Sequence, residues 1–176
     1  MTLYVYIAQS LDGFIADKNG GLDWLNEIPN PDKSDFGFAE FMSKIDAVVM
    51  GRNTFEKVQS FGIWPYNKPV YIISSTLNEV PKEYSGKAEI LNLKPPQIIE
   101  KLNKEGFNNL YIDGGALIQS FLSEDLIDEL IITSVPVLLG DGISLFGKLG
   151  NCLKFKLQKS EVLIDSLIMS HYLRKK

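Results

Sequence analysis

Short apolar runs alternate with segments of helical periodicity along most of the chain. Phe38, Phe41, Met42 and Ile45 recur at the spacing of one helix face and predict a helix over about residues 35–44. Runs rich in β-branched and aromatic residues predict strands at 3–9, 46–50, 69–75, 89–93, 110–113 and 129–138. Further helices are expected at 54–60, from Pro95 onward and at 116–122. Residues 155–162 and 166–174 are typical of an antiparallel hairpin.

This order of elements predicts an α/β fold. Strands that alternate with helices form a mostly parallel central sheet with helices on both faces, and the C-terminal hairpin adds antiparallel strands at one edge. The sequence contains no internal repeat, low-complexity tract or long linker, so residues 1–176 are predicted to form a single domain. Ligands of such sheets bind beyond the carboxyl ends of the strands. The residues that follow each strand are therefore the ones to inspect.

Composition narrows the possible partners. The chain has 176 residues and 45% hydrophobic content, enough for one core. Its longest apolar stretches, such as 130–139, fall well short of the roughly 20 residues of a membrane helix. The N-terminus has neither a basic leader nor a cleavage pattern, which favours a cytoplasmic location. A net charge of −4 argues against nucleic acid or a membrane surface and favours a small-molecule substrate.

The chain has one cysteine, Cys152, and one histidine, His171. A single cysteine excludes a disulfide or a thiolate cluster within the chain, and a single histidine leaves no zinc site of the usual kind, so no metal is expected. His171 lies in an alternating apolar segment and is interpreted as a half-exposed strand histidine.

Three segments that follow strands could bind phosphate groups. Gly51 and Arg52 stand where a buried strand turns into a helix, so free N–H groups and a guanidinium could bind an anion; a glycine turn with a Thr N-cap is the alternative. The hydroxyls of 74–76 could hold a phosphate on an adenosine ribose, although hydroxyls are also common turn formers. Gly114 and Gly115 would let a pyrophosphate approach the backbone, or form a simple tight turn.

A fourth segment covers residues 8–16 and is followed by a long loop. Its Asp12-Gly13 pair is a turn signal, and the loop at 17–31, which includes Trp24, could close over a flat ring. The chain has neither the G-x-G-x-x-G fingerprint nor a P-loop, so an ordinary Rossmann site and a P-loop site are unsupported.

In order along the chain, four motifs resemble the dihydrofolate reductase superfamily. They are Ser10-Leu11-Asp12-Gly13-Phe14-Ile15-Ala16, Val49-Met50-Gly51-Arg52-Asn53-Thr54-Phe55-Glu56, Ile72-Ile73-Ser74-Ser75 and Ile112-Asp113-Gly114-Gly115. The first motif, Asp23-Trp24-Leu25 and Leu138-Leu139-Gly140-Asp141-Gly142 are most similar to the bacterial branch related to the reductase domain of riboflavin biosynthesis, the RibD C-terminal domain.

The resemblance implies an NADPH-dependent reductase that transfers hydride to a pterin-like or pyrimidine-like ring, and it implies residue roles. Asp12 and Trp24 would lie near the substrate. The implied cofactor-binding residues are Ala8, Ile15, Gly51, Arg52, Asn53, Thr54, Ser74, Ser75, Gly114, Gly115, Ala116 and Leu117. Among them, Arg52 and the two serines would favour the 2′-phosphate of NADPH over NADH.

The proton donor has two candidates, Asp35 and Asp12. Asp35 falls at about the place where the classical enzyme carries a carboxylate on its first helix, but an aspartate there also suits a helix N-terminus. Three functions follow: 5-amino-6-(5-phosphoribosylamino)uracil reductase, dihydrofolate reductase proper, or a non-catalytic nucleotide-binding protein on the same fold. The first substrate carries a phosphate, for which Lys33, Lys44 and Lys148 are candidate partners. The branch is commonly homodimeric, and 131–139 with the Phe146 loop could supply the interface.

Overall fold

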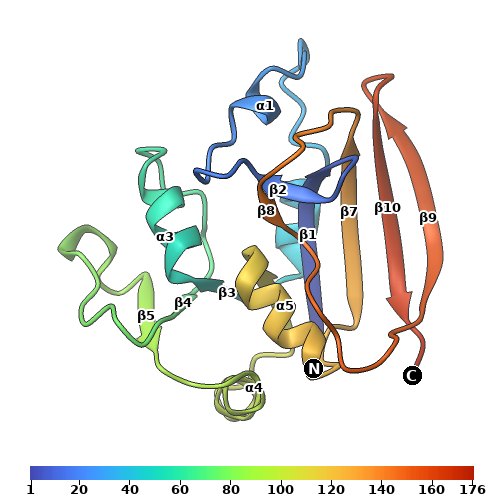
Figure 1. The fold of residues 1–176 in the computed structure, drawn as a ribbon. Coiled ribbons are helices and arrows are strands. Elements are labelled where there is room, and N and C mark those ends of the chain that lie inside the picture. Colours follow the sequence, from blue (N-terminus) through green and yellow to red (C-terminus); the bar gives the residue numbers. More distant parts are fainter.

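The computed structural model describes residues 1–176, which form an eight-stranded sheet covered by helices on both faces (Figure 1). The strand order is β5-β4-β3-β6-β1-β7-β10-β9. The strands are β1 (Thr2–Ser10), β3 (Ala47–Gly51), β4 (Val70–Ile73), β5 (Ala88–Leu91), β6 (Asn109–Asp113), β7 (Glu129–Val135), β9 (Phe155–Leu163) and β10 (Leu167–Arg174). All pairs from β5 to β7 are parallel, whereas β10 is antiparallel to both β7 and β9.

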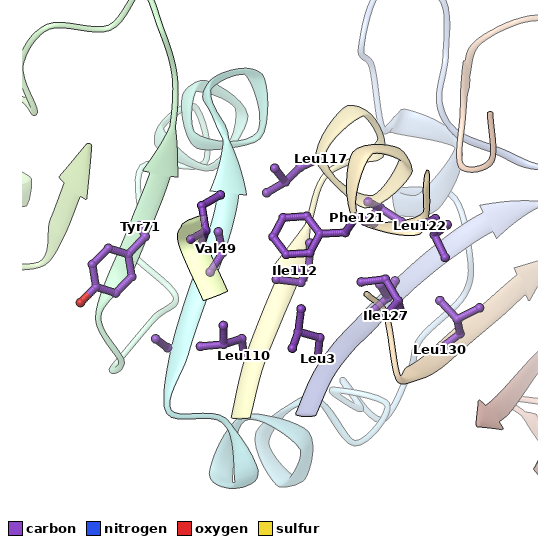
Figure 2. Packing of buried hydrophobic residues seen from close by; sticks show 14 of the residues in the cluster. Leu3, Val49, Tyr71, Leu110, Ile112, Leu117, Phe121, Leu122, Ile127 and Leu130 are labelled. Atoms are coloured by element: carbon purple, nitrogen blue, oxygen red, sulfur yellow. The ribbon is translucent and has the colours of Figure 1, made fainter. Parts of the chain in front are cut away.

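The sheet separates the core into two layers, each of which is covered by helices. The helices are α1 (Asp23–Asn26), α2 (Phe38–Lys44), α3 (Arg52–Gln59), α4 (Pro95–Lys104), α5 (Gly115–Ser123) and the 3₁₀ helix η1 (Lys82–Tyr84). On one face, Phe121 and Leu122 of α5 pack against Ile112 and Ile127, as Figure 2 shows. On the other face, Phe41 of α2 packs in a second cluster. Apolar residues at helical spacing therefore bury one stripe of each helix.

The predicted fold class is confirmed, including the final hairpin. The predicted helix over 35–44 begins only at Phe38, because Gly37 has a φ of 87°, outside the helical range. The predicted strand at 129–138 ends at Val135, before a proline. The interpretation of His171 is confirmed: its side chain is 32% exposed, and its Nε2 lies 2.7 Å from Oε2 of Glu129.

Two short strands were not predicted. β2 (Phe14–Ala16) and β8 (Ile143–Ser144) pair with each other and lie with α1 above the carboxyl ends of the parallel strands in Figure 1. Two or three residues carry no readable periodicity, so only the fold reveals them.

The proposed dimer segment 131–139 is mostly internal. β7 lies between β1 and β10, and only its continuation is exposed, at Leu138. Phe146 in the other proposed interface segment is 43% exposed, and the homodimer stays a prediction. None of the helices is long and apolar enough to cross a membrane.

Candidate active site

A cavity of about 420 Å³ opens at the carboxyl ends of β1 and β7, on the sheet face that α2 covers. Most of its wall is apolar, and a few polar side chains point into it. The lining residues are Tyr6, Ala8, Leu25, Asn26, Ile28, Asn30, Asp35, Phe36, Phe38, Thr133, Val135 and Leu167. An apolar pocket of this size with a few polar groups suits one flat ring with short substituents.

Asp35 lines this cavity just before α2. Its carboxylate accepts hydrogen bonds from the backbone N–H groups of Ala39, at 2.9 Å, and Gly37, at 3.0 Å. Those bonds lower the pKa of Asp35, the bond from Ala39 most. The carboxylate thus stabilises the start of the helix and also presents a negative charge to the cavity. A lowered pKa makes Asp35 a poor proton donor and a good acceptor for ligand N–H groups.

Asp12 connects two segments outside the cavity lining. Its carboxylate accepts hydrogen bonds from the Ser10 hydroxyl, at 2.5 Å, and from the N–H groups of Gly140, at 2.7 Å, and Leu139, at 3.2 Å. The Ser10 bond and then the two backbone bonds lower the pKa of Asp12. Asp12 therefore holds the end of β1 to the segment after β7, which lies beside the cavity.

Trp24 supports the cavity wall from behind. The side chain is 8% exposed and packs with Val135 and Leu167, which both line the cavity. Its neighbour Leu25 lines the cavity directly. The indole N–H of Trp24 is buried without a hydrogen-bond partner. Trp24 thus holds α1 against this wall of the cavity.

Asp113 is the acid that the sequence analysis missed. Asp113 pairs with Met50 of β3 and follows Tyr111 by two residues, so it lies on the same face of the sheet as Tyr111, whose hydroxyl donates to the carbonyl of the cavity residue Tyr6 at 2.9 Å. Asp113 itself does not line the cavity. Burial raises the pKa of Asp113 from 3.8 to about 6, although the N–H of Gly114 and nearby tyrosine hydroxyls partly offset it. A carboxyl group with such a pKa can hold a proton near neutral pH and donate it.

A cation and two hydroxyls meet at the ends of β3 and β4. Nη1 of Arg52, the first residue of α3, donates to Oγ1 of Thr76 at 3.0 Å. The Ser74 hydroxyl accepts from the N–H groups of Thr76, at 3.1 Å, and Leu77, at 2.9 Å, so it shapes the turn. Ser75 is exposed beside them. Thr76, one of the three hydroxyl residues at 74–76 singled out in the sequence, is thus one partner of Arg52 in this cluster; the other is Glu56, whose Oε1 lies 3.3 Å from Nε of Arg52.

Neighbouring atoms leave no room for a side chain at the two glycines after β6. Gly114 has a φ of 93°, and a Cβ there would come within 2.1 Å of Oγ1 of Thr54. At Gly115 a Cβ would come within 2.9 Å of Cδ1 of Ile15 and 3.2 Å of the Ser144 carbonyl. These contacts bring together the turn after β3, the turn after β6 and the β2–β8 pair. The predicted cofactor segments therefore lie side by side across the carboxyl edge of the sheet.

This edge fits a dinucleotide. Gly51 has open space where a Cβ would stand, with no atom within 4 Å, so a ligand can approach the backbone there. The helices α3 and α5 both begin at this edge and present free N–H groups, with Arg52 at one end and Ala8 in the cavity at the other.

Comparison with known proteins identifies the family. The model of the RibD C-terminal domain matches residues 1–169. The chain belongs to the RibD C-terminal domain family. Members of this family are reductases with a dihydrofolate reductase-like fold.

Among relatives of this RibD-type chain, the uncharacterized protein YwjB of Bacillus subtilis is 36% identical over 173 residues, covering 97% of this chain and 96% of YwjB. YyaP of the same organism is 32% identical over 154 residues, 80% of this chain and 77% of YyaP. A putative riboflavin biosynthesis protein from Shewanella sp. PV-4 is 53% identical over the whole of both chains, with a TM-score of 0.97.

A more distant structure shows the fold alone. It is the diaminohydroxyphosphoribosylaminopyrimidine deaminase/5-amino-6-(5-phosphoribosylamino)uracil reductase of Thermotoga maritima, which is 18% identical with a TM-score of 0.74. The match covers 99% of this chain and 56% of that longer protein.

One expectation for a RibD-type substrate does not match the site. Lys33, Lys44 and Lys148 were candidate partners for a substrate phosphate, and none of them lines the cavity. Lys44 instead pairs with Glu40 on the exposed side of α2, with Nζ 3.1 Å from Oε1.

Proposed function

We propose that this chain is an NADPH-dependent reductase that delivers hydride to a pterin-type or pyrimidine-type ring. The observation that supports the proposal best is the position of three features on one edge of the sheet. The glycine turns that we assign to a dinucleotide, the cavity and the carboxyl group of Asp113 all lie at the carboxyl ends of neighbouring strands. A reductase needs these three parts within reach of one another.

NADPH, when bound, supplies the hydride. The turn residues Gly114 and Gly115 and the start of α3 would hold its diphosphate. Arg52 and Thr76 would bind the 2′-phosphate, since a guanidinium and a hydroxyl both donate to phosphate oxygens. Ala8, in the cavity wall, and Ile15, against Gly115, would flank the nicotinamide.

The chain itself positions the ring and provides the proton. Asp35 accepts hydrogen bonds from ring N–H groups, and the apolar walls of Phe36 and Phe38 exclude water from the reacting face. Asp113, which can hold a proton near neutral pH, is the proposed source of that proton; it ends β6, the strand next to β1, whose residues Tyr6 and Ala8 line the cavity.

A cofactor titration tests this proposal. Tryptophan fluorescence is followed while NADPH or NADH is added, and we expect a clear preference for NADPH. Arg52→Gln should reduce that preference about tenfold or more, because one charge-assisted contact to the 2′-phosphate is lost. Lys57→Gln, a charge change later in α3, is the matched control. Binding of neither cofactor would refute the reductase proposal.

Dihydrofolate reductase is a second candidate, favoured by the presence of Asp35 in the cavity. NADPH oxidation is measured after adding dihydrofolate. Turnover that is lost in Asp35→Asn would establish the folate activity, and NADPH binding without folate turnover would exclude it. Binding of NADPH without turnover on any ring substrate would favour a non-catalytic nucleotide-binding protein.

A further inference from the structure

The charge of the cavity distinguishes between classes of ring substrate. Of the residues that line it, Asp35 is the one charged side chain, and no lysine or arginine is among them. The other polar lining residues are Asn26, Asn30 and Thr133. The Asn30 amide is already engaged, because its Nδ2 donates to the Ser34 carbonyl at 2.8 Å and its Oδ1 accepts from the Ser34 N–H at 2.9 Å.

The negative charge of Asp35 also acts on Tyr6 in the cavity wall. Burial first, and then the charges of Asp35 and Glu161, raise the pKa of the Tyr6 hydroxyl to about 12. Glu161 does not line the cavity and is paired with Lys159, whose Nζ lies 2.8 Å from its Oε2. Asp35 is therefore the carboxylate in the lining that no lysine or arginine of the lining compensates.

A phosphate group in this cavity would have no cation to pair with and would face Asp35. Phosphate carries close to two negative charges at neutral pH, and sites that bind it provide arginine, lysine or backbone N–H groups. The Arg52 cluster, which has that chemistry, lies at the ends of β3 and β4, at the cofactor end of the edge.

We propose that the substrate is an unphosphorylated flat heterocycle, neutral or protonated, whose N–H groups face Asp35. This inference rests on the proposed function and narrows it. The name of the Thermotoga protein assigns it a phosphoribosylamino-uracil substrate, whereas the lining of the present cavity contains no lysine or arginine to pair with a phosphate. The phosphate would therefore be absent from the start or be removed by a phosphatase before reduction.

A matched ligand pair tests the inference. The probes are 5-amino-6-(ribitylamino)uracil and its 5′-phosphate, which are already reduced and differ only in the phosphate. Binding of each to the full-length protein with saturating NADPH is measured by calorimetry. We expect the unphosphorylated probe to bind about tenfold tighter or more, because the phosphate faces an uncompensated carboxylate. Equal or tighter binding of the phosphate would overturn the inference.

Two variants show whether charge is the cause. Asp35→Asn should narrow the ratio between the two probes, whereas Glu40→Gln, an equal charge change on the exposed side of α2, should leave it unchanged. Asn26→Lys should place a cation in the lining and raise the affinity for the phosphorylated probe. An unaltered ratio in both cavity variants would contradict the electrostatic explanation.

The test separates this inference from the cofactor proposal. Binding of neither probe would refute the uracil-type ring as occupant of the cavity. A separate NADPH titration on the same protein measures the cofactor site, so failure there refutes the reductase proposal itself.

Discussion

The raised pKa of Asp113 predicts how the stability of Asp113→Asn depends on pH. In the unfolded chain the carboxyl group has its ordinary pKa of 3.8, and in the folded protein about 6. The folded state therefore binds a proton more tightly than the unfolded state does. Proton binding therefore stabilises the folded state at pH values below the pKa of the unfolded chain. This stabilisation is lost as the pH rises through the pKa of the folded protein.

The size of the effect follows from the two pKa values. Above about pH 7 the wild-type protein bears a penalty of about 3 kcal/mol in folding free energy from this carboxylate, and at about pH 5 roughly half of that. Asp113→Asn removes this penalty at both pH values. The stability gained by the variant should thus be about 1–2 kcal/mol larger at about pH 7.5 than at about pH 5. For a chain of this size the difference is about 3–6 °C in Tm.

Urea unfolding of both proteins at the two pH values measures this quantity. Changes in hydrogen bonding on substitution are the same at both values, so they cancel in the comparison. Asp35→Asn is the control, with a pH dependence of the opposite sign. Backbone hydrogen bonds lower the pKa of Asp35, so the stability that this carboxylate contributes to the folded state is lost as the pH falls. An identical pH dependence in wild type and Asp113→Asn would refute the assignment of Asp113 as a buried, proton-holding acid.

Three further outcomes are expected. Gly51→Ala should leave Tm nearly unchanged, because its Cβ meets no atom, but weaken NADPH binding if the dinucleotide occupies that space; titration and thermal unfolding separate the two. Gly115→Ala should cost about 1–3 kcal/mol in unfolding, since its Cβ would lie 2.9 Å from Cδ1 of Ile15, and a lower Tm checks this. Tyr66→Phe should move the pH at which reductase activity declines upward, because the Tyr66 hydrogen bond lowers the pKa of Asp113; a downward shift in the rate profile would contradict that.

The sequence and the structure agree on the local pattern of this fold. The helix of α4 and the hairpin of β9 and β10 were predicted within a few residues, because periodicity and turn chemistry act between near neighbours. The errors lie where short segments depend on distant contacts. The β2–β8 pair joins residues more than a hundred positions apart, and the start of α2 is decided by the positive φ of Gly37.

The residues of the candidate site also fall into those that a local sequence signal indicates and those that only long-range contacts reveal. The glycine turns at Gly51 and Gly114 were recognised from the sequence, because a glycine between a strand and a helix is a local signal. Asp113 was read only as the residue before two glycines. Its raised pKa arises from burial among side chains of other elements, which no local pattern reports.

The sequence by itself determined the order of strands and helices, the glycine turns and the family resemblance. Only the tertiary structure decided which turns meet at one edge, which carboxyl group is desolvated and which charged side chain lines the cavity. The strand order β4-β3-β6-β1-β7 brings residues from five separate segments together, and the burial and electrostatics of that edge depend on this long-range pairing. Local patterns set the elements, whereas the chemistry of the site comes from contacts between residues far apart in the chain.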